Sequence, residues 1–436
     1  ICRNPSRMPT PAIPSYRGTA AEPAADLRAC GFLRFLPSAF LPAVFLLLLG
    51  GCALAAGVDP DHHVSGVERI VAIGDLHGDW NGYMATLEAA GLVDARGRWN
   101  AGETHLVQTG DIPDRGPDTR RIIEHMQRLA RQARRDGGAV HNLMGNHEAM
   151  NVYGDLRYVT PDEFTAWADR SSARLRERYL DELLDRMEAN DPEAFAALPD
   201  DFEQRWKTEH PEGWLEHRYA WSPLWAEDGE MYEWVRAQRV AVRINDVVFL
   251  HGGISAAYCS SSLSDWTERA RDALDARSQD ELDILVDPVG PLWYRGLSGV
   301  EPTATPKTVD AILRRFEAAH IVVGHTPTGG VIWPRYGGRV IQIDTGIADH
   351  YGGHVGYLEI TPQGRFAGYR DGRVPLPDDR SGLAEYVRAV IDLHPGDEAL
   401  AARLAELEAE ALARGESAEG EASTEPAKSV SCRAAF

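Results

Sequence analysis

The chain is poor in cysteine, and its cysteines are not spaced for metal binding. Five cysteines occur among 436 residues, and no two have the Cys-x-x-Cys spacing of a zinc knuckle. The spacing also indicates no disulfide framework. We therefore interpret Cys259 as a small, buried apolar residue rather than a redox-active thiol.

Positively charged residues are fewer than negatively charged ones. Lysine and arginine total 45 against 66 aspartate and glutamate residues, which gives a formal net charge of −21. Because duplex nucleic acids are bound largely through neutralisation of their phosphates by lysine and arginine, nucleic acid is not expected as a partner. A local basic pocket for a single phosphoryl group remains compatible with this composition.

The apolar run at residues 40–49 is too short for a membrane-spanning helix, which needs about 20 residues. A basic segment precedes it and small residues follow, so residues 1–57 are predicted to be a bacterial export signal and leader. The protein would then be periplasmic. Leu49-Gly50-Gly51-Cys52 resembles a lipobox, and we favour a lipoprotein anchored at Cys52. Cleavage after Ala55 would instead release a soluble protein, and a single membrane anchor is the third possibility.

The sequence does contain short polar motifs, and the first three of them recur at regular intervals. Asp75 and Asp111 are 36 positions apart (111 − 75), and Asp111 and Asn146 are 35 apart (146 − 111). This interval is about one βαβ unit, so each motif should follow a strand of one sheet, where the strand ends converge. The five motifs are Gly74-Asp75-Leu76-His77-Gly78, Gly110-Asp111-Ile112-Pro113-Asp114-Arg115-Gly116, Gly145-Asn146-His147-Glu148, His251-Gly252-Gly253 and Gly324-His325-Thr326.

The side chains in these motifs are ligands for divalent metal ions. Asp111 is expected to bridge two ions about 3.5–4 Å apart. A water shared by the two ions would lose a proton near neutral pH, and the bridging hydroxide would attack phosphorus in line. The predicted ligands are Asp75 and His77 on the first metal, Asn146, His251 and His325 on the second, and Asp111 on both.

Neighbouring residues complete a phosphoesterase site. Arg115 should present its guanidinium to phosphate oxygens. His147, expected in an extended loop, suits a general acid for the leaving oxygen, and Asp114 could position its imidazole and keep it protonated. Asp344 is interpreted as a turn or cap residue, with a role in orienting a ligand histidine as the alternative.

Apolar runs alternate with helical patterns, which predicts an α/β domain with a largely parallel inner sheet. Residues 151–238 differ because they are helical, charged and rich in tryptophan. Within them, Thr160-Pro161-Asp162-Glu163 predicts a capping box that begins a helix. This helical insert could form a wall over the site or only stabilise the sheet. Residues 397–436 are predicted to form an acidic helix and a disordered tail, which leaves 58–396 as the catalytic domain.

The five motifs in this order resemble the phosphoprotein phosphatase family of metallophosphoesterases over residues 67–372. Pro327 stands where many other metallophosphoesterases carry another histidine ligand. Residues 145–159 and Pro291-Leu292-Trp293-Tyr294-Arg295-Gly296 are similar to the Shewanella-like protein phosphatases. The resemblance implies a calcineurin-like fold of two mixed β-sheets sandwiched by helices, with Arg295 as a second phosphate clamp.

The resemblance also implies hydrolysis of phosphoproteins, on phosphotyrosine, on phosphoserine and phosphothreonine, or on both. Manganese is the expected metal in vitro, and iron and zinc suit the same ligands. A dinucleoside polyphosphate hydrolase is the alternative, although that group usually lacks the counterpart of Asp114. A binding protein with a decayed site is the third class, but all six ligand positions and His147 are present. The sequence does not specify the oligomeric state.

Overall fold

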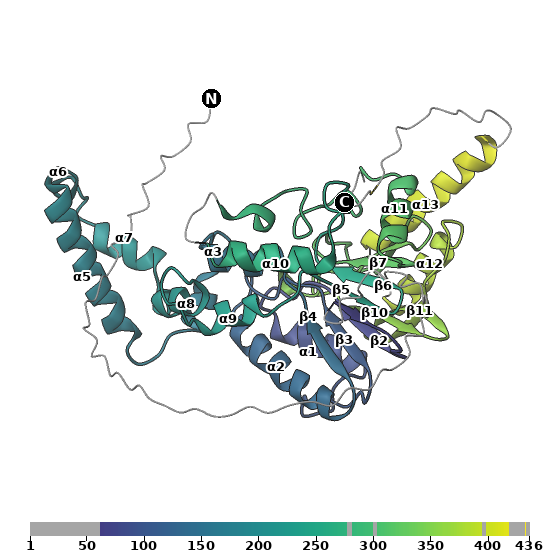
Figure 1. Cartoon of the computed structure of the whole chain (residues 1–436), viewed down its shortest axis with the longest axis horizontal. Helices are drawn as coiled ribbons and strands as arrows, with labels where there is room; N and C mark the ends of the chain where they lie inside the picture. Colours follow the sequence, from purple (N-terminus) through teal and green to yellow (C-terminus); the bar gives the residue numbers. More distant parts are fainter. Residues whose placement is uncertain (1–61, 277–280, 300–302, 395–397, 418–431, 433–436) are drawn as a thin grey trace, which may run out of the picture. The chain divides into compact units, whose positions relative to one another are not determined.

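The computed structural model describes residues 62–276, 281–299, 303–394, 398–417 and 432 (Figure 1). The predicted export signal, with its lipobox at Cys52, lies outside these residues. Among the described residues, no helix combines the length and the apolar character needed to cross a membrane.

The centre of the fold is a pair of six-stranded mixed sheets. The first has the order β12-β11-β10-β2-β3-β4, and its strands β2, β3 and β4 run parallel. The second has the order β1-β5-β6-β7-β9-β8, in which β6, β7 and β9 are parallel. The bounds in the first sheet are β2 Ile70–Ile73, β3 His105–Gln108, β4 Ala139–Asn142, β10 Gly356–Thr361, β11 Gly364–Tyr369 and β12 Gly372–Pro375. Those in the second are β1 His63–Val64, β5 Ala241–Ile244, β6 Val247–Leu250, β7 His320–Val323, β8 Trp333–Arg335 and β9 Val340–Gln342.

Side chains alternate between two apolar layers along these strands. Ile70 and Ala72 of β2 pack in one cluster with Val247 and Phe249 of β6, so this layer joins the two sheets. Val71 belongs to the other cluster, which contains the buried faces of the helices. Because successive residues of a strand point to opposite faces, continuous apolar runs are what a sheet covered on both sides requires.

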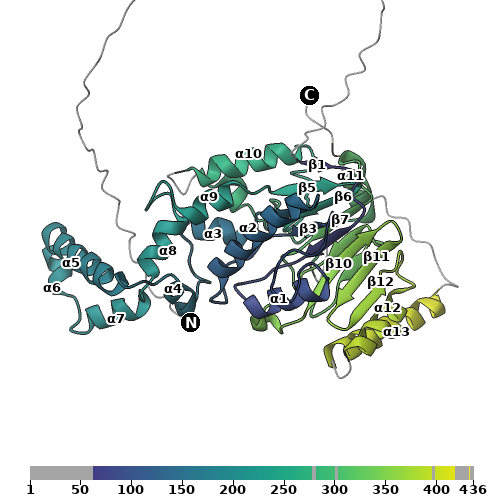
Figure 2. The same ribbon diagram turned by 90° about the horizontal axis from the view of Figure 1, so that it is seen from below.

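Helices cover the outer faces of the sheets (Figure 2). On these faces lie α1 Trp80–Ala89, α2 Thr119–Arg135, α10 Leu263–Leu274 and α11 Pro306–Arg315, whereas α12 Leu383–Leu393 and α13 Glu398–Ser417 pack against the apolar layer between the sheets. In α2, Ile122, Met126 and Leu129 are fully buried, as their helical spacing predicts. The predicted fold, an α/β protein with two mixed sheets between helices, is confirmed.

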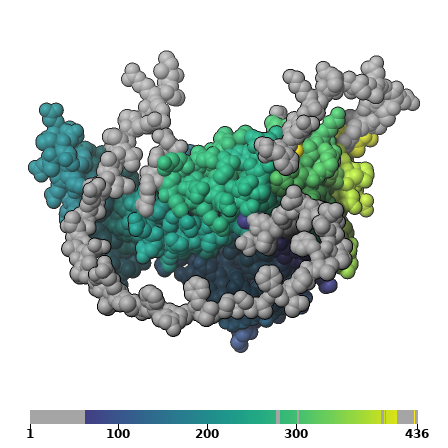
Figure 3. Space-filling model, viewed as in Figure 1, coloured from purple at the N-terminus to yellow at the C-terminus, as the bar shows by residue number. Residues whose placement is uncertain are grey.

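The insert after the third motif is helical, as expected. Its helices are α4 Pro161–Thr165, α5 Ser172–Asn190, α6 Pro192–Ala196, α7 Phe202–Glu209, α8 Trp214–Trp221 and α9 Glu230–Arg236. In the space-filling view, α5–α7 (blue-teal) lie at one edge of the face formed by α10 and its surroundings (Figure 3). The domain limits at residues 58, 151–238 and 396 stay predictions.

Two local predictions need correction. The third motif does not form an extended loop, because Asn146 begins helix α3, Asn146–Tyr153. The Glu148 carboxylate accepts the Gly145 backbone N–H at 2.9 Å, which caps this helix. At Thr160, the hydroxyl accepts the Glu163 N–H at 3.2 Å as predicted. The Glu163 side chain does not complete the box, because it is fully buried.

The expectation of no disulfide is wrong. Cys259 is buried as predicted, but it is bonded to Cys432, 173 positions away. Spacing could not reveal this pair, because so distant a partner leaves no local pattern. Cys432 also packs against the core, so this one position of the predicted tail is ordered. The rest of the tail beyond Ser417 lies outside the described residues.

Loss of this disulfide is expected to destabilise the protein. A crosslink over so long a loop restricts the unfolded chain, and removing a native disulfide costs about 2–5 kcal/mol. Thermal unfolding of the chain from Val58 should therefore shift to lower temperature in reductant. Cys259→Ser and Cys432→Ser should lower the Tm equally, and reductant should then have no further effect. Two titratable free thiols in the unreduced, folded protein would contradict the bond.

Candidate metal centre

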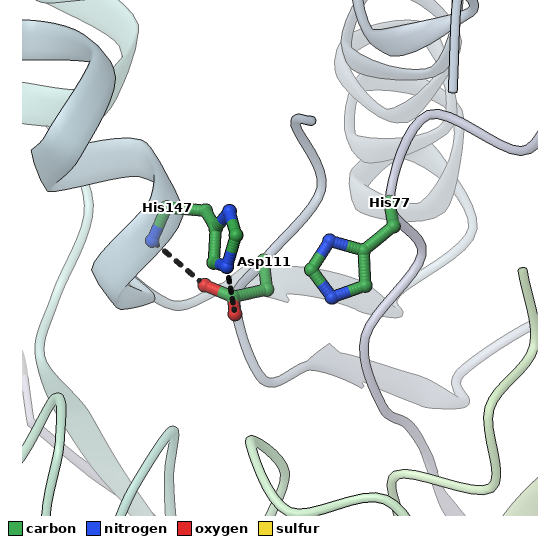
Figure 4. A group of neighbouring side chains, drawn as sticks. All are labelled: His77, Asp111 and His147. Atoms are coloured by element: carbon green, nitrogen blue, oxygen red, sulfur yellow. Dashed lines mark hydrogen bonds and ion pairs between the residues drawn. The ribbon is translucent and has the colours of Figure 1, made fainter. Parts of the chain in front are cut away.

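The five motifs converge where strands β2, β3, β4, β6 and β7 end. Asp111, which follows β3, lies at the centre of the predicted ligands. Its Oδ2 atom is 3.2 Å from Nε2 of His251 and 3.7 Å from Nε2 of His147. Figure 4 shows the imidazoles of His77 and His147 on either side of this carboxylate. Predicted ligands far apart in the sequence are therefore brought together.

Asp111 is shared by two groups of possible metal ligands. The donor atoms of His77, Asp111 and His147 all lie within 4.8 Å of one another, as do those of Asp111, His251 and His325. Asp75 is in neither group, although its Oδ2 lies 4.0 Å from Nε2 of His77. Asp111 thus lies between the two groups, and its bridging role stays a prediction, whereas His147, which was not predicted to be a ligand, belongs to the first group.

In the second group, acceptor atoms face one another. Nδ1 of His251 lies 3.0 Å from the carbonyl oxygen of Thr109, which assigns the ring proton to this nitrogen. The Nε2 lone pair then points at Oδ1 of Asn146, 2.9 Å away, and lies 3.0 Å from Nδ1 of His325. Such a cluster of lone pairs is unfavourable unless a cation lies between them, so these residues fit a metal ion.

In the first group, too, a backbone carbonyl oxygen orients the ring of a histidine. Nδ1 of His77 lies 3.1 Å from the Pro113 carbonyl oxygen, so its Nε2 faces inward. Asp75 accepts the backbone N–H of His325 at 3.1 and 3.2 Å, which ties the ends of β2 and β7 together. Burial and the charge of His147 lower the pKa of His77 to about 3, which keeps this imidazole neutral and able to bind a metal.

Buried carboxyl groups surround the centre. Asp75, Asp111, Glu148 and Asp344 are each at most 2% exposed. Burial and the Asp344 and Asp111 carboxylates raise the pKa of Asp75, and burial raises that of Asp344 to about 6. Burial opposes the ionised form of Asp111 too, but the imidazoles of His251 and His147 outweigh it and lower its pKa. A divalent cation would relieve the repulsion among these groups.

Several site residues have left-handed backbone conformations. The φ angles are 45° at His77, 60° at Asp111, 75° at Asp114, 69° at Arg115 and 66° at His325. A residue other than glycine adopts this region at a cost of about 1–2 kcal/mol, and such residues concentrate at functional sites. The surrounding core therefore holds these turns in place.

Two motif glycines are required by the close approach of carboxylates. A Cβ atom at Gly145 would lie 2.2 Å from Oδ1 of Asp111, and one at Gly324 would lie 2.5 Å from Oδ1 of Asp75. Both contacts are far below van der Waals separation. Any side chain there would displace a predicted metal ligand.

His147 and Asp114 form a buried pair. Nδ1 of His147 is hydrogen-bonded to Oδ2 of Asp114, whose other oxygen accepts from Nδ2 of Asn151 at 2.9 Å. The His147 backbone N–H donates to Oδ1 of Asp111 at 2.9 Å. Burial lowers the pKa of His147, but Asp111 and Asp114 together raise it to about 9, so the imidazole carries a proton at neutral pH.

The sequence analysis gave Glu148 no role, yet it joins the second and third motifs. Its carboxylate accepts the backbone N–H groups of Asp111, Ile112 and Gly145 at 2.9, 2.7 and 2.9 Å. Asp344 follows β9 at the same edge, where it accepts the Gly346 N–H at 3.1 Å. This bond fits the turn interpretation, and because Asp344 also interacts electrostatically with His251, its role in orienting a ligand histidine stays a prediction.

The two predicted phosphate clamps lie on different sides of the centre. The Arg115 guanidinium lies 4.1 Å above the ring of Tyr158 in the insert. Arg295 donates to the carbonyl oxygen of His325 at 2.6 Å and to Oγ1 of Thr326 at 2.9 Å. The structure therefore brings both arginines to the edge of the metal centre.

Aromatic side chains to which the sequence assigned no role flank the predicted ligands. The ring of Tyr158 lies 5.1 Å from that of His147, and the ring of Tyr351 lies 5.1 Å from that of His77. Trp293 lies 5.9 Å from the imidazole of His325. No local pattern in the sequence indicated that these rings contact the histidines.

Comparison with known proteins agrees with this arrangement. Residues 68–329 match the calcineurin-like phosphoesterase family. The chain is 37% identical over 209 residues to Shewanella-like protein phosphatase 2 of Arabidopsis thaliana, covering 47% of this chain and 51% of that protein. It is 30% identical over 301 residues to an uncharacterised Schizosaccharomyces pombe protein, covering 67% of this chain and 77% of that one. The structure of the cold-active protein-tyrosine phosphatase of a psychrophilic Shewanella species has a TM-score of 0.54 at 30% identity, covering 72% of this chain and 82% of that chain.

The chain belongs to the calcineurin-like phosphoesterase family, as its motifs predicted. Its relatives include Shewanella-like protein phosphatases, so the resemblance drawn from residues 145–159 is confirmed. The enzyme class is that of a metal-dependent phosphatase, a phosphoric monoester hydrolase.

Metal binding is expected to stabilise the fold, because a ligand held only by the native state adds RT ln(1 + [L]/Kd), about 4 kcal/mol at a thousandfold excess over Kd. Chelation should lower the Tm, and Mn²⁺ should restore it with two ions per chain by elemental analysis. Asp111→Asn should lose most of this shift. Asp371→Asn, an exposed control outside the site, should keep it. An unchanged Tm on chelation, with no metal bound, would contradict the assignment.

Proposed function

We propose that the protein is a dinuclear-metal phosphatase of phosphoproteins that prefers phosphotyrosine. The observation that carries the proposal is the convergence of metal-ligand side chains on Asp111, with Arg115 and Arg295 at the edge of the same centre. Asp75, His77 and Asp111 are the proposed ligands of one metal, and Asp111, Asn146, His251 and His325 those of the other.

Two bound cations would supply an activated water and neutralise charge on the phosphoryl group. The chain's own residues would bind the phosphate group and protonate the leaving oxygen. Arg115 and Arg295 would bind the phosphate oxygens with their guanidinium groups and orient the phosphorus. Nε2 of His147 would give its proton to the leaving oxygen, because Asp114 accepts from Nδ1 and holds the ring in that direction.

The preference for phosphotyrosine is supported by the aromatic side chains around the ligands. A phenyl ring leaving the centre could pack against Tyr158 or Tyr351, which flank His147 and His77. An alkyl side chain such as phosphoserine would gain less from these contacts. The Shewanella relative, whose structure resembles this one, is named a protein-tyrosine phosphatase.

The identity of the metal is proposed to depend on supply. Imidazole, carboxylate and amide oxygen ligands suit manganese, iron and zinc, and the order of affinities alone does not select the metal in a cell. We propose that Mn²⁺ supports activity in vitro.

The decisive assay is phosphate release by the Mn²⁺-loaded chain from Val58. The phosphotyrosine peptide should exceed a phosphoserine peptide of the same sequence at least about fivefold in kcat/KM, since an aromatic pair contributes about 0.5–1.5 kcal/mol and two rings flank the site. Tyr351→Ala should reduce this ratio, and Asp111→Asn should abolish turnover of both. Turnover of a dinucleoside polyphosphate alone would instead assign the protein to nucleotide metabolism.

We further propose export to the periplasm through residues 1–57, with Cys52 as a lipid-modified N-terminus. The disulfide between Cys259 and Cys432 supports this location, because such bonds persist in oxidising compartments. Mass spectrometry of the protein from a bacterial host should find an acylated Cys52 at the N-terminus of membrane-associated protein. An unmodified N-terminus at residue 56 would indicate a soluble periplasmic form, and an uncleaved cytoplasmic chain would contradict export.

A further inference from the structure

Glu163 of helix α4 is a buried carboxyl group that the mechanism above does not use. Its residue is 0% exposed, and neither carboxyl oxygen has a hydrogen-bond partner of normal geometry. Burying such a group without partners is costly, so its presence calls for a physical reason. Capping of helix α4 is not that reason, because the cap is made by the hydroxyl of Thr160 and the backbone N–H of Glu163, without the Glu163 carboxyl group.

The surroundings of Glu163 belong to the proposed catalytic pair. Burial and the Asp114 carboxylate raise the pKa of Glu163 well above its usual value. The hydroxyl of Thr119 and the backbone N–H of Asp114 donate toward the Glu163 carboxyl group and lower its pKa, but less strongly. The Thr119 hydroxyl is itself buried and has no other partner. Glu163 therefore lies against the turn that carries Asp114.

This turn needs support. Asp114 and Arg115 both have left-handed backbones, with φ angles of 75° and 69°. The insert holds the turn at a second point, because the Arg115 backbone N–H donates to the Tyr158 carbonyl oxygen at 3.2 Å. Tyr158 and Glu163 are five positions apart (163 − 158), so one short segment of the insert contacts both residues of the turn.

We propose that Glu163 is a positioning residue that fixes the Asp114–Arg115 turn and thereby the direction of the His147 imidazole. The proposal rests on the proposed role of His147 as general acid. It gives the insert a part in catalysis, because the insert would set the geometry of proton donation without contacting the substrate through Glu163. A carboxyl group that only fills space would have no such effect.

The dependence of kcat on the leaving group distinguishes a positioning role of Glu163 from a carboxyl group that only fills space. Proton donation matters little when the leaving phenol is acidic and much when it is not, so the test compares p-nitrophenyl phosphate with phenyl phosphate. His147→Asn, as the reference variant, should lose about a hundredfold or more in kcat on phenyl phosphate, the usual contribution of a general acid, and much less on p-nitrophenyl phosphate.

Glu163→Leu keeps the approximate volume and removes the polar group. It should lose about tenfold in kcat on phenyl phosphate and less than threefold on p-nitrophenyl phosphate, with bound metal unchanged. Glu163→Gln, which keeps the shape and an acceptor oxygen, should recover most of the loss. Thr119→Val should show the same bias more weakly, and it keeps the proposal testable if Glu163→Leu does not fold. Asp162→Leu, at the exposed neighbouring position, should leave both rates unchanged.

Equal losses on both substrates in Glu163→Leu and Thr119→Val, or no loss in either, would overturn the positioning role. If His147→Asn shows the bias and neither of these variants does, only the role of Glu163 fails. If His147→Asn shows no bias, the general acid itself is wrong, and the inference about Glu163 fails with it.

Discussion

The carboxylate of Asp111 has to stay ionised in a place that water hardly reaches, and the neighbouring structure serves that requirement. The residue is 1% exposed and lies among other buried carboxyl groups. The backbone N–H and the protonated imidazole of His147 stabilise its charge, and Glu148 accepts its backbone N–H. The glycine at 145 leaves room for its oxygen. Each of these groups is specified by a motif, which explains why the motifs contain glycine and acidic residues as well as ligands.

The central strands provide the rigidity that this arrangement needs. Strands β2 and β6 are buried along their whole length, and the layer between the two sheets is apolar. Left-handed backbones at His77, Asp111 and His325 come shortly after the ends of β2, β3 and β7. The unfavourable turns are therefore attached to buried strands, and hydrogen bonds such as that from the His325 N–H to the Asp75 carboxylate connect one strand end with another.

The sequence predicted the parts of the site that depend on the strands. Equal spacing of the motifs implied that Asp75, Asp111 and Asn146 follow neighbouring strands, and β2, β3 and β4 are indeed adjacent. Side chains whose environment depends on distant segments were beyond local patterns. Glu163 matches the sequence of a capping box, and only the tertiary packing turns its carboxyl group inward. Cys259 finds its partner 173 positions away, and no periodicity marks the contact of Tyr158 with His147.

The site has two sides of different origin. The proposed metal ligands follow buried strands, so their positions are fixed by the two sheets. The opposite side is built from a turn at Asp114 and Arg115 and from the insert that follows the third motif, through the backbone of Tyr158 and the carboxyl group of Glu163. Groups that would bind metal and groups that would orient the leaving oxygen therefore rest on different supports. The two supports are linked at two points, because His147 joins Asp111 to Asp114 and the Pro113 carbonyl oxygen lies 3.1 Å from Nδ1 of His77.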